Sequence, residues 1–177
     1  MQDKLIKRIK KITVLLCDVD GVLTRGGIIL GSKGQEFKQF DVQDGMGITL
    51  AREGGLKTGI ITGRESEAVK LRAKELKMDI IHQGIKDKLQ ILISIMNDLH
   101  IGYENICYIG DDLLDMNIMI RSGISACPGN ARKEVKEISD IITEKKGGKG
   151  AVRELVEIIL KTQNKWNDII KKYREGK

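Results

Sequence analysis

The sequence has 177 residues, the usual length of a single domain, so we expect one domain over residues 1–177. Hydrophobic residues make up 41% of the chain and charged residues 32%, so it can bury a core and is not predominantly disordered. Aromatic residues amount to only 3%, which argues against the rows of stacked aromatic side chains that bind single-stranded nucleic acids.

The net charge of +6 comes largely from the two ends of the sequence. Lysine and arginine gather at positions 4–11 and 171–177, a pattern typical of solvated helix faces, and the excess also suits a small anionic substrate. We therefore expect no specific binding to nucleic acid. The sequence shows neither the apolar segment that is typical of a signal peptide nor an apolar run long enough to span a membrane. Its three cysteines, Cys17, Cys107 and Cys127, cannot all form disulfide bonds within one chain. These features predict a cytoplasmic protein that does not bind membranes.

Short apolar runs alternate with amphipathic segments along the chain. Runs rich in branched aliphatic residues predict buried strands at residues 12–17, 58–61, 80–81, 106–109 and 124–126. Helical spacing of apolar residues predicts helices at residues 46–53, 65–76, 88–99 and 152–172. This alternation indicates βαβ units, and therefore an α/β fold with a doubly wound parallel sheet.

One segment, residues 26–40, interrupts the alternation directly after the first predicted strand. A glycine-rich turn lies there between two short apolar stretches, which predicts a β-hairpin. In open α/β sheets, ligands bind beyond the carboxyl ends of the strands, so the hairpin is expected to flank a site. The chain between Thr62 and Lys88 suffices for one helix and one strand, which leaves no room for a large cap domain.

Two groups of aspartates follow two of the predicted strands. Asp18 and Asp20 follow the first strand, and Asp111, Asp112 and Asp115 follow the strand at 106–109. Parallel strands bring both groups to one edge of the sheet, where two unit charges 4 Å apart repel by roughly 4 kcal/mol at an effective dielectric constant near 20. A hard divalent cation removes this cost, and oxygen ligands suit Mg²⁺. The alternative is that these aspartates cap helices or lie in solvated loops, most of all Asp112.

Two further strand ends carry groups that suit an anion. Thr62, Gly63 and Arg64 end the strand at 58–61 and precede a helix, whose first amide groups attract negative charge. Lys88 begins the helix at 88–99. Alone, such a threonine is usually a cap and such a lysine a solvated charge. At successive strand ends around a metal site, they predict a phosphate-binding site.

These motifs, in this order, resemble the signatures of the haloacid dehalogenase superfamily. Residues 18–24 (DVDGVLT) are similar to the first signature, Thr62–Arg64 to the second, Lys88 to the third and residues 110–115 to the fourth. The resemblance covers nearly the whole chain. It implies a Mg²⁺-dependent phosphatase that works through a phosphoaspartate intermediate.

The resemblance implies a role for each acidic or basic group of the site. Asp18 would be the nucleophile and Asp20 the acid and base, while Thr62 and Lys88 would hold phosphoryl oxygens. The implied metal ligands are the carboxylates of Asp18 and Asp111 and the backbone carbonyl of Asp20.

Asp112 and Asp115 would then orient Lys88 or the metal-bound waters.

An alternative from another class is a receiver domain of two-component signalling, which also combines aspartates, threonine, lysine and Mg²⁺ on a doubly wound sheet. In such domains, however, the phosphoacceptor lies on a central strand separate from the acidic pair, whereas the candidate acceptor here, Asp18, follows the first strand.

Within the superfamily, the chain most resembles the capless phosphatases of 3-deoxy-D-manno-octulosonate (KDO) 8-phosphate, which act in lipopolysaccharide precursor synthesis. The similar segments are residues 40–47, 61–66, 83–88 and 147–154. This resemblance implies a sugar-acid phosphate substrate and a homotetramer in which a neighbouring subunit covers the open site.

Three residues are candidates for contacts with the sugar acid. Arg64 can pair bidentately with an α-keto acid carboxylate. Asp44 and Gly45 are candidates for substrate contact, the alternative being that they only begin a helix. The segment at 147–150 either closes over the site or is a plain loop.

Two positions depart from the family pattern, and the second of them favours an alternative substrate, a nine-carbon sialic-type sugar acid 9-phosphate. Arg25 replaces a common acidic residue, and residues 127–131 (CPGNA) resemble phosphatases of such sugars. Those relatives tend to lack the arginine equivalent to Arg64, so KDO 8-phosphate remains the first choice.

Overall fold

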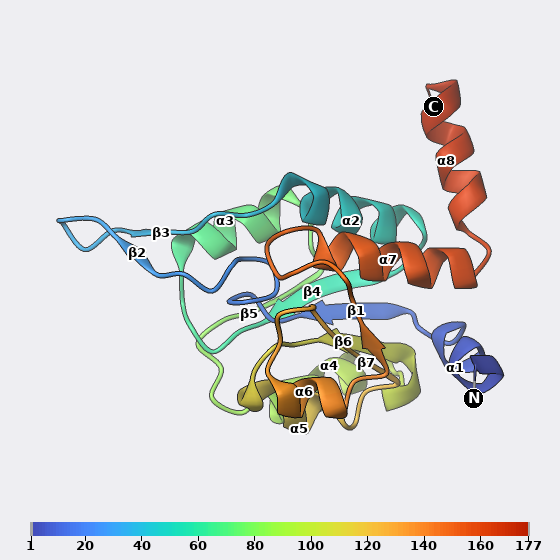
Figure 1. Ribbon diagram of the computed structural model, residues 1–177, viewed down its shortest axis with the longest axis horizontal. Helices are drawn as coiled ribbons and strands as arrows, with labels where there is room; N and C mark the ends of the chain where they lie inside the picture. The colour runs from blue at the N-terminus through green and yellow to red at the C-terminus, as the bar shows by residue number, and fades with distance from the viewer. Residues whose placement is uncertain (1, 177) are drawn as a thin grey trace.

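The computed structural model describes residues 2–176, and parallel strands form its central sheet (Figure 1). In spatial order these strands are β5 (Ile80–His82), β4 (Lys57–Ile61), β1 (Val14–Cys17), β6 (Ile106–Ile109), β7 (Ile124–Cys127) and β8 (Ile141–Ile142). Every neighbouring pair is parallel, so the doubly wound parallel sheet is confirmed. The two-residue strand β8 at one edge has no counterpart among the predicted strands.

Helices cover both faces of the sheet (Figure 1). One layer holds α2 (Val42–Glu53), α3 (Glu67–Glu75) and α7 (Ala151–Thr162), and the other holds α4 (Lys88–Leu99), α5 (Met116–Met119) and α6 (Lys133–Glu137). The remaining helical segments are α1 (Gln2–Ile9), η1 (Tyr103–Asn105), η2 (Leu113–Asp115) and α8 (Trp166–Glu175). Within residues 2–176, no helix combines the length and apolarity that crossing a bilayer requires.

Strand β1 shows why its sequence is apolar without interruption. Its side chains alternate between the two faces, so Leu15 and Cys17 pack in the core under α2 and α7, while Val14 and Leu16 pack in the core over α4. All four residues are buried. A strand with helices on both faces therefore has no position at which a polar side chain would reach water.

Helix α2 begins at Val42, earlier than the predicted range 46–53, because Asp41 caps it by accepting a backbone hydrogen bond. The part of α2 that the prediction missed includes Gly45, and glycine disfavours a helix interior. Gly47 is tolerated inside α2 because a Cβ atom there would lie 2.8 Å from the Cα of Arg153 in α7. Only glycine lets these two helices approach so closely.

The prediction of a single helix over 152–172 is wrong. Helix α7 ends at Thr162 and α8 begins at Trp166, and between them Asn164 adopts a left-handed conformation with φ of 60°. Asparagine tolerates this conformation better than most residues do. Because no glycine or proline marks the end of α7, the sequence did not predict the break between the two helices. Helix α8 points away from the sheet (Figure 1).

The predicted hairpin within 26–40 is confirmed as a two-stranded antiparallel ribbon, formed by β2 (Ile29–Leu30) and β3 (Glu36–Phe37). It extends away from the body of the molecule, at the end of the sheet where β1 ends (Figure 1). Four large apolar side chains on it are exposed: Ile28, Ile29, Leu30 and Phe37.

Candidate active site

The strand order brings the separate motifs of the sequence together. Because β1 lies between β4 and β6, the segments that follow these three strands adjoin one another at one edge of the sheet. Cys17, the last residue of β1, pairs with Ile60 on one side and Ile109 on the other. Asp18 therefore emerges between Thr62 and the aspartates that follow β6.

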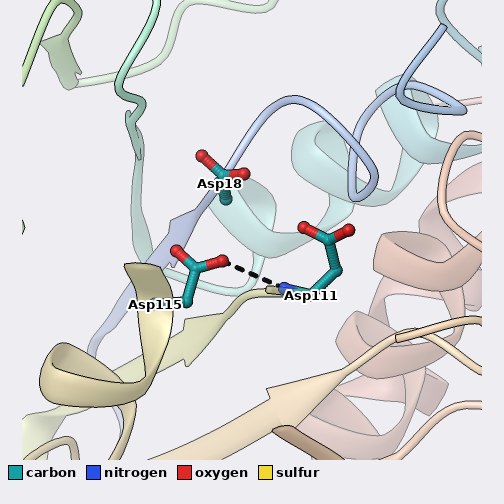
Figure 2. Close-up of side chains that lie close together, drawn as sticks. All are labelled: Asp18, Asp111 and Asp115. Carbon is teal, nitrogen blue, oxygen red and sulfur yellow. Dashed lines mark hydrogen bonds between the residues drawn. The ribbon is translucent and has the colours of Figure 1, made fainter. Parts of the chain in front are cut away.

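Three aspartate side chains surround one small space at this edge (Figure 2). One carboxylate oxygen from each of Asp18, Asp111 and Asp115 lies within 4.8 Å of the others. The carboxylate of Asp111 rests against Gly21, where a Cβ atom would lie 2.0 Å from Oδ2. Gly21 also has a φ of 93°, so both its conformation and the available space require glycine.

Lys88, the first residue of α4, joins two of these carboxylates. Its buried Nζ donates hydrogen bonds to Oδ1 of Asp18 and Oδ1 of Asp115, each 2.7 Å long. The hydroxyl of Tyr108 donates to the same oxygen of Asp115 at 2.8 Å and accepts from Lys88 at 3.2 Å. Sequence reasoning missed Tyr108, although a tyrosine inside a buried strand needs a partner for its hydroxyl, and that requirement was the available signal.

The electrostatics of the cluster follow from burial and crowding. Burial, then repulsion from Asp115, raises the pKa of Asp18 to about 6, although Lys88 opposes the change. Burial, then the charges of Asp18, Asp115 and Asp112, raises the pKa of Asp111 to about 7. Burial also disfavours the charge of Lys88, but Asp18 and Asp115 outweigh it, so the pKa of Lys88 is raised.

The donor atoms fit a magnesium ion. Within residues 2–176, no hydrogen bond or ion pair reaches the carboxylate of Asp111, and Lys88 lowers its pKa less than burial and the neighbouring aspartates raise it. In contrast, Asp115 is already bound on both oxygens, because Oδ2 accepts backbone hydrogen bonds from Asp111 and Asp112. Asp18 and Asp111 are therefore the carboxylates best placed to hold a hard cation.

The base of the hairpin contributes charged groups beside Asp20. Oδ1 of Asp20 accepts a hydrogen bond from Nζ of Lys38, and Oε2 of Glu36 accepts one of 2.8 Å from Nη2 of Arg64. Nε of Arg64 lies 3.8 Å from Oδ2 of Asp20. Sequence reasoning missed Lys38 and Glu36, because charged residues on a hairpin ordinarily face water.

Asp44 and Gly45 lie in the first turn of α2, where the structure gives both of them a part in helix packing; their contact with substrate stays a prediction. Asp44 is buried, and its carboxylate accepts backbone hydrogen bonds from Gly150, Val152 and Arg153 at the start of α7, at 3.1, 2.9 and 3.1 Å. At Gly45 a Cβ atom would collide with a guanidinium group of α3. Both residues therefore serve helix packing, and Asp44 caps α7.

Three further predicted positions surround this cluster without joining it. The exposed carboxylate of Asp112 accepts the backbone N–H of Leu113 at 2.8 Å, which fits the capping alternative. Gly63 is exposed next to the buried Thr62. The segment at 147–150 is a packed loop that buttresses the turn after β1, because the N–H of Gly148 donates to the carbonyl of Val22 at 2.8 Å.

Comparison with known proteins points to one family. Residues 71–155 match the family described as haloacid dehalogenase-like hydrolase. The chain is 38% identical to the 3-deoxy-D-manno-octulosonate 8-phosphate phosphatase of Yersinia pestis over 163 residues. These aligned residues make up 92% of this chain and 87% of the relative. The phosphatase of the same name from Escherichia coli K12 is 37% identical over the same shares of both chains.

A solved structure agrees with these sequence relatives. The 3-deoxy-D-manno-octulosonate 8-phosphate phosphatase of Moraxella catarrhalis, in complex with a magnesium ion, a phosphate ion and a KDO molecule, is 40% identical to this chain. It superposes with a TM-score of 0.94 over 98% of this chain and 99% of that one. The resemblance that the motifs suggested is thus confirmed, and the receiver-domain alternative is set aside. The chain belongs to the 3-deoxy-D-manno-octulosonate 8-phosphate phosphatase family of haloacid dehalogenase-like hydrolases.

Proposed function

We propose that this protein is a Mg²⁺-dependent phosphatase that hydrolyses KDO 8-phosphate to KDO and phosphate. The observation that carries the proposal is the convergence of Asp18, Asp111 and Lys88, from three distant parts of the chain, on one buried polar cluster. The names of the sequence relatives and the KDO complex of the Moraxella protein support the choice of substrate.

The carboxylates of Asp18 and Asp111, with the backbone carbonyl of Asp20, would hold the metal. When bound, Mg²⁺ neutralises negative charge on the phosphoryl group and on the carboxylates around it. Lys88 adds positive charge at the same place, because its ammonium group contacts Asp18 directly. A dianionic substrate can therefore approach a carboxylate nucleophile without prohibitive repulsion.

The residues permit a two-step reaction. An oxygen of Asp18 attacks phosphorus in line, the bond from phosphorus to the sugar oxygen breaks, and Asp20 gives its proton to that leaving oxygen. Thr62 and Lys88 hold phosphoryl oxygens during the transfer. Asp20 then takes a proton from the water that attacks the phosphoaspartate, which releases phosphate and restores Asp18.

Arg64 is the proposed clamp for the carboxylate of the sugar acid. Its side chain is 46% exposed and lies beside Asp20, so it is both accessible and close to the reacting groups. Its guanidinium already holds a carboxylate, that of Glu36, at 2.8 Å. A substrate carboxylate would displace Glu36 and pair bidentately with the guanidinium, which now holds Glu36 by a single hydrogen bond.

We also propose that the protein assembles as a homotetramer in which a neighbouring subunit covers the site. The hairpin residues Ile29, Leu30 and Phe37 expose apolar surface, as do Leu113 and Leu114. The last two line a groove that also includes Lys88, so this apolar surface reaches the edge of the proposed active site. Burial of these side chains between subunits would remove them from water.

A substrate panel tests the function. We expect the wild-type protein with Mg²⁺ to release phosphate from KDO 8-phosphate with a higher kcat/KM than from a nine-carbon sugar acid 9-phosphate or p-nitrophenyl phosphate. Arg64→Ala should lower kcat/KM for KDO 8-phosphate by about 10- to 100-fold, chiefly through KM, because it removes a bidentate ion pair of about 1.5–3 kcal/mol. It should affect p-nitrophenyl phosphate little, since that substrate has no carboxylate.

Arg174→Ala is the matched control, because Arg174 lies on α8, which projects from the opposite end of the molecule from the hairpin (Figure 1). It should leave all three activities unchanged. A preference for the nine-carbon substrate would replace KDO 8-phosphate as the proposed substrate. An equal loss on all three substrates in Arg64→Ala would remove Arg64 from the role of clamp.

A further inference from the structure

Lys38, which directly follows β3 of the hairpin, has an unusually buried charge. Only 1% of its side chain is exposed, although the hairpin around it faces water. Its Nζ lies 2.5 Å from Oδ1 of Asp20 and 3.0 Å from Oε1 of Glu36. An ammonium group loses its hydration on burial, which is tolerated only when it is well paired. These two carboxylates are the groups that pair it.

The contact acts on one oxygen of Asp20 and leaves the other available. Oδ1 is bound by Lys38, whereas the nearest charged group to Oδ2 is Nε of Arg64, at 3.8 Å. The Asp20 side chain stands on an irregular turn after β1 and is partly exposed. Its direction is therefore fixed chiefly by this ion pair, together with a longer hydrogen bond of 3.4 Å that Oδ1 accepts from Oγ1 of Thr24, rather than by regular secondary structure.

We propose that Lys38 is a positioning residue that holds the Asp20 carboxyl group for proton transfer to the leaving oxygen. The proposal rests on the role of Asp20 in the proposed function. Lys38 anchors Oδ1, so Oδ2 carries the transferred proton. As the bond from phosphorus to the leaving oxygen breaks, that proton passes to the oxygen, and the carboxylate that remains lies beside the ammonium group of Lys38.

Glu36 extends this arrangement to the proposed clamp. One of its oxygens lies 3.0 Å from Nζ of Lys38, and the other accepts a hydrogen bond from Arg64. The hairpin therefore links Asp20 and Arg64 through a continuous row of alternating charges. Lys38 and Glu36 belong to none of the four signatures of the family resemblance, since both lie in the segment between the first and the second signature.

The dependence of the rate on the leaving group tests the proposal. Proton donation matters most when the leaving oxygen is strongly basic, so a series of aryl phosphates of similar size, from p-nitrophenyl to phenyl phosphate, reports on it. General acid catalysis contributes about 10²–10⁴-fold, so we expect Lys38→Met to lower kcat/KM for phenyl phosphate at least about tenfold, but less than about threefold for p-nitrophenyl phosphate. KDO 8-phosphate, with its more basic alcohol, should lose more still.

Two variants complete the experiment. Lys38→Arg retains a cation and should recover most of the lost activity on phenyl phosphate. Lys33→Met, at the exposed turn of the same hairpin, is the matched control and should behave as the wild type. All variants are compared by thermal unfolding and by gel filtration, so that misfolding or loss of assembly is recognised.

Three results would overturn the proposal. A loss that is equal across the aryl series would show that Lys38 only supports the hairpin. A loss confined to KDO 8-phosphate would mean that Lys38 contacts the sugar acid instead of acting through Asp20, and unchanged kinetics would leave it no part in the reaction. If the wild type released phosphate from none of these substrates, the proposed function itself would fail, which is a distinguishable outcome.

Discussion

Aspartate side chains have different roles in this protein, which depend on the hydrogen-bond donors around them. Asp44 accepts three backbone hydrogen bonds and caps a helix. Asp115 is bound on both oxygens by Lys88, by Tyr108 and by backbone amides. Asp111 receives no such bond within residues 2–176 and rests against Gly21. Asp111, which these donors leave free, is therefore one of the two carboxylates that we expect to bind the metal.

The contact between Gly21 and Asp111 gives a prediction at this scale. Gly21→Ala should lower the affinity for Mg²⁺ at least about tenfold, because the new Cβ atom would displace the Asp111 carboxylate. The positive φ should also cost about 1–3 kcal/mol of folding stability. Titration of the phosphatase activity with Mg²⁺ measures the first effect and urea unfolding the second.

Gly34→Ala separates the two effects. Gly34 has a φ of 80°, but a Cβ atom there would meet nothing within 4 Å. Its substitution should carry the conformational cost without changing Mg²⁺ affinity. Equal losses of Mg²⁺ affinity in both variants would contradict the assignment of Asp111.

At the scale of helices and strands, the sequence predicted what depends on local pattern. The buried strands follow from continuous apolar runs, and the alternation of strands with helices predicted one edge at which Asp18, Thr62 and Lys88 meet. The capping of α7 by Asp44 was not predictable in this way, because it joins residues more than 100 positions apart. The buried state of Lys38 depends likewise on how the hairpin packs against the turn after β1.

Asp44 provides the test at this scale. Asp44→Ala should destabilise the protein by about 2 kcal/mol, since it removes a helix cap and leaves buried N–H groups unpaired. Asp41→Ala, which removes the more exposed cap of α2, should cost about 1 kcal/mol or less. Urea unfolding measures both. If Asp44→Ala kept its stability and instead raised KM for the substrate, the prediction of a substrate contact would be supported and the capping role contradicted.

For the whole molecule, the exposed apolar hairpin is the main feature that a single chain does not explain. Leu30→Asp should therefore convert the proposed tetramer into smaller species, because a charge would be buried between subunits. Ser32→Asp, at the exposed turn of the same hairpin, should not. Light scattering coupled to gel filtration measures the mass of each. A wild-type monomer would contradict the proposed assembly.

The carboxylate cluster also makes the stability of the whole protein depend on pH and metal. Because folding raises the pKa of Asp18 from 3.8 to about 6 and that of Asp111 to about 7, the folded protein binds these protons more tightly than the unfolded chain. Proton binding by Asp18 and Asp111 therefore adds its full amount to the free energy of unfolding below about pH 4. This amount is lost as the pH rises through 6 and 7.

Mg²⁺ competes with those protons for the same oxygens. The increase in Tm on adding Mg²⁺ should therefore be larger near pH 8 than near pH 5, as measured by thermal unfolding with and without a chelator. Asp111→Asn should largely abolish the increase at both pH values. An increase that is the same at both, or that survives Asp111→Asn, would place the metal elsewhere.

The central claim is that Asp18 becomes covalently phosphorylated beside the metal held by Asp111. Rapid acid quench of the enzyme during turnover, followed by peptide mass spectrometry, measures this directly. The account predicts phosphate on the peptide that contains Asp18, and none on Asp18→Asn, whose turnover should be at least about 10³-fold slower. Phosphate on another residue, or full turnover by Asp18→Asn, would contradict it.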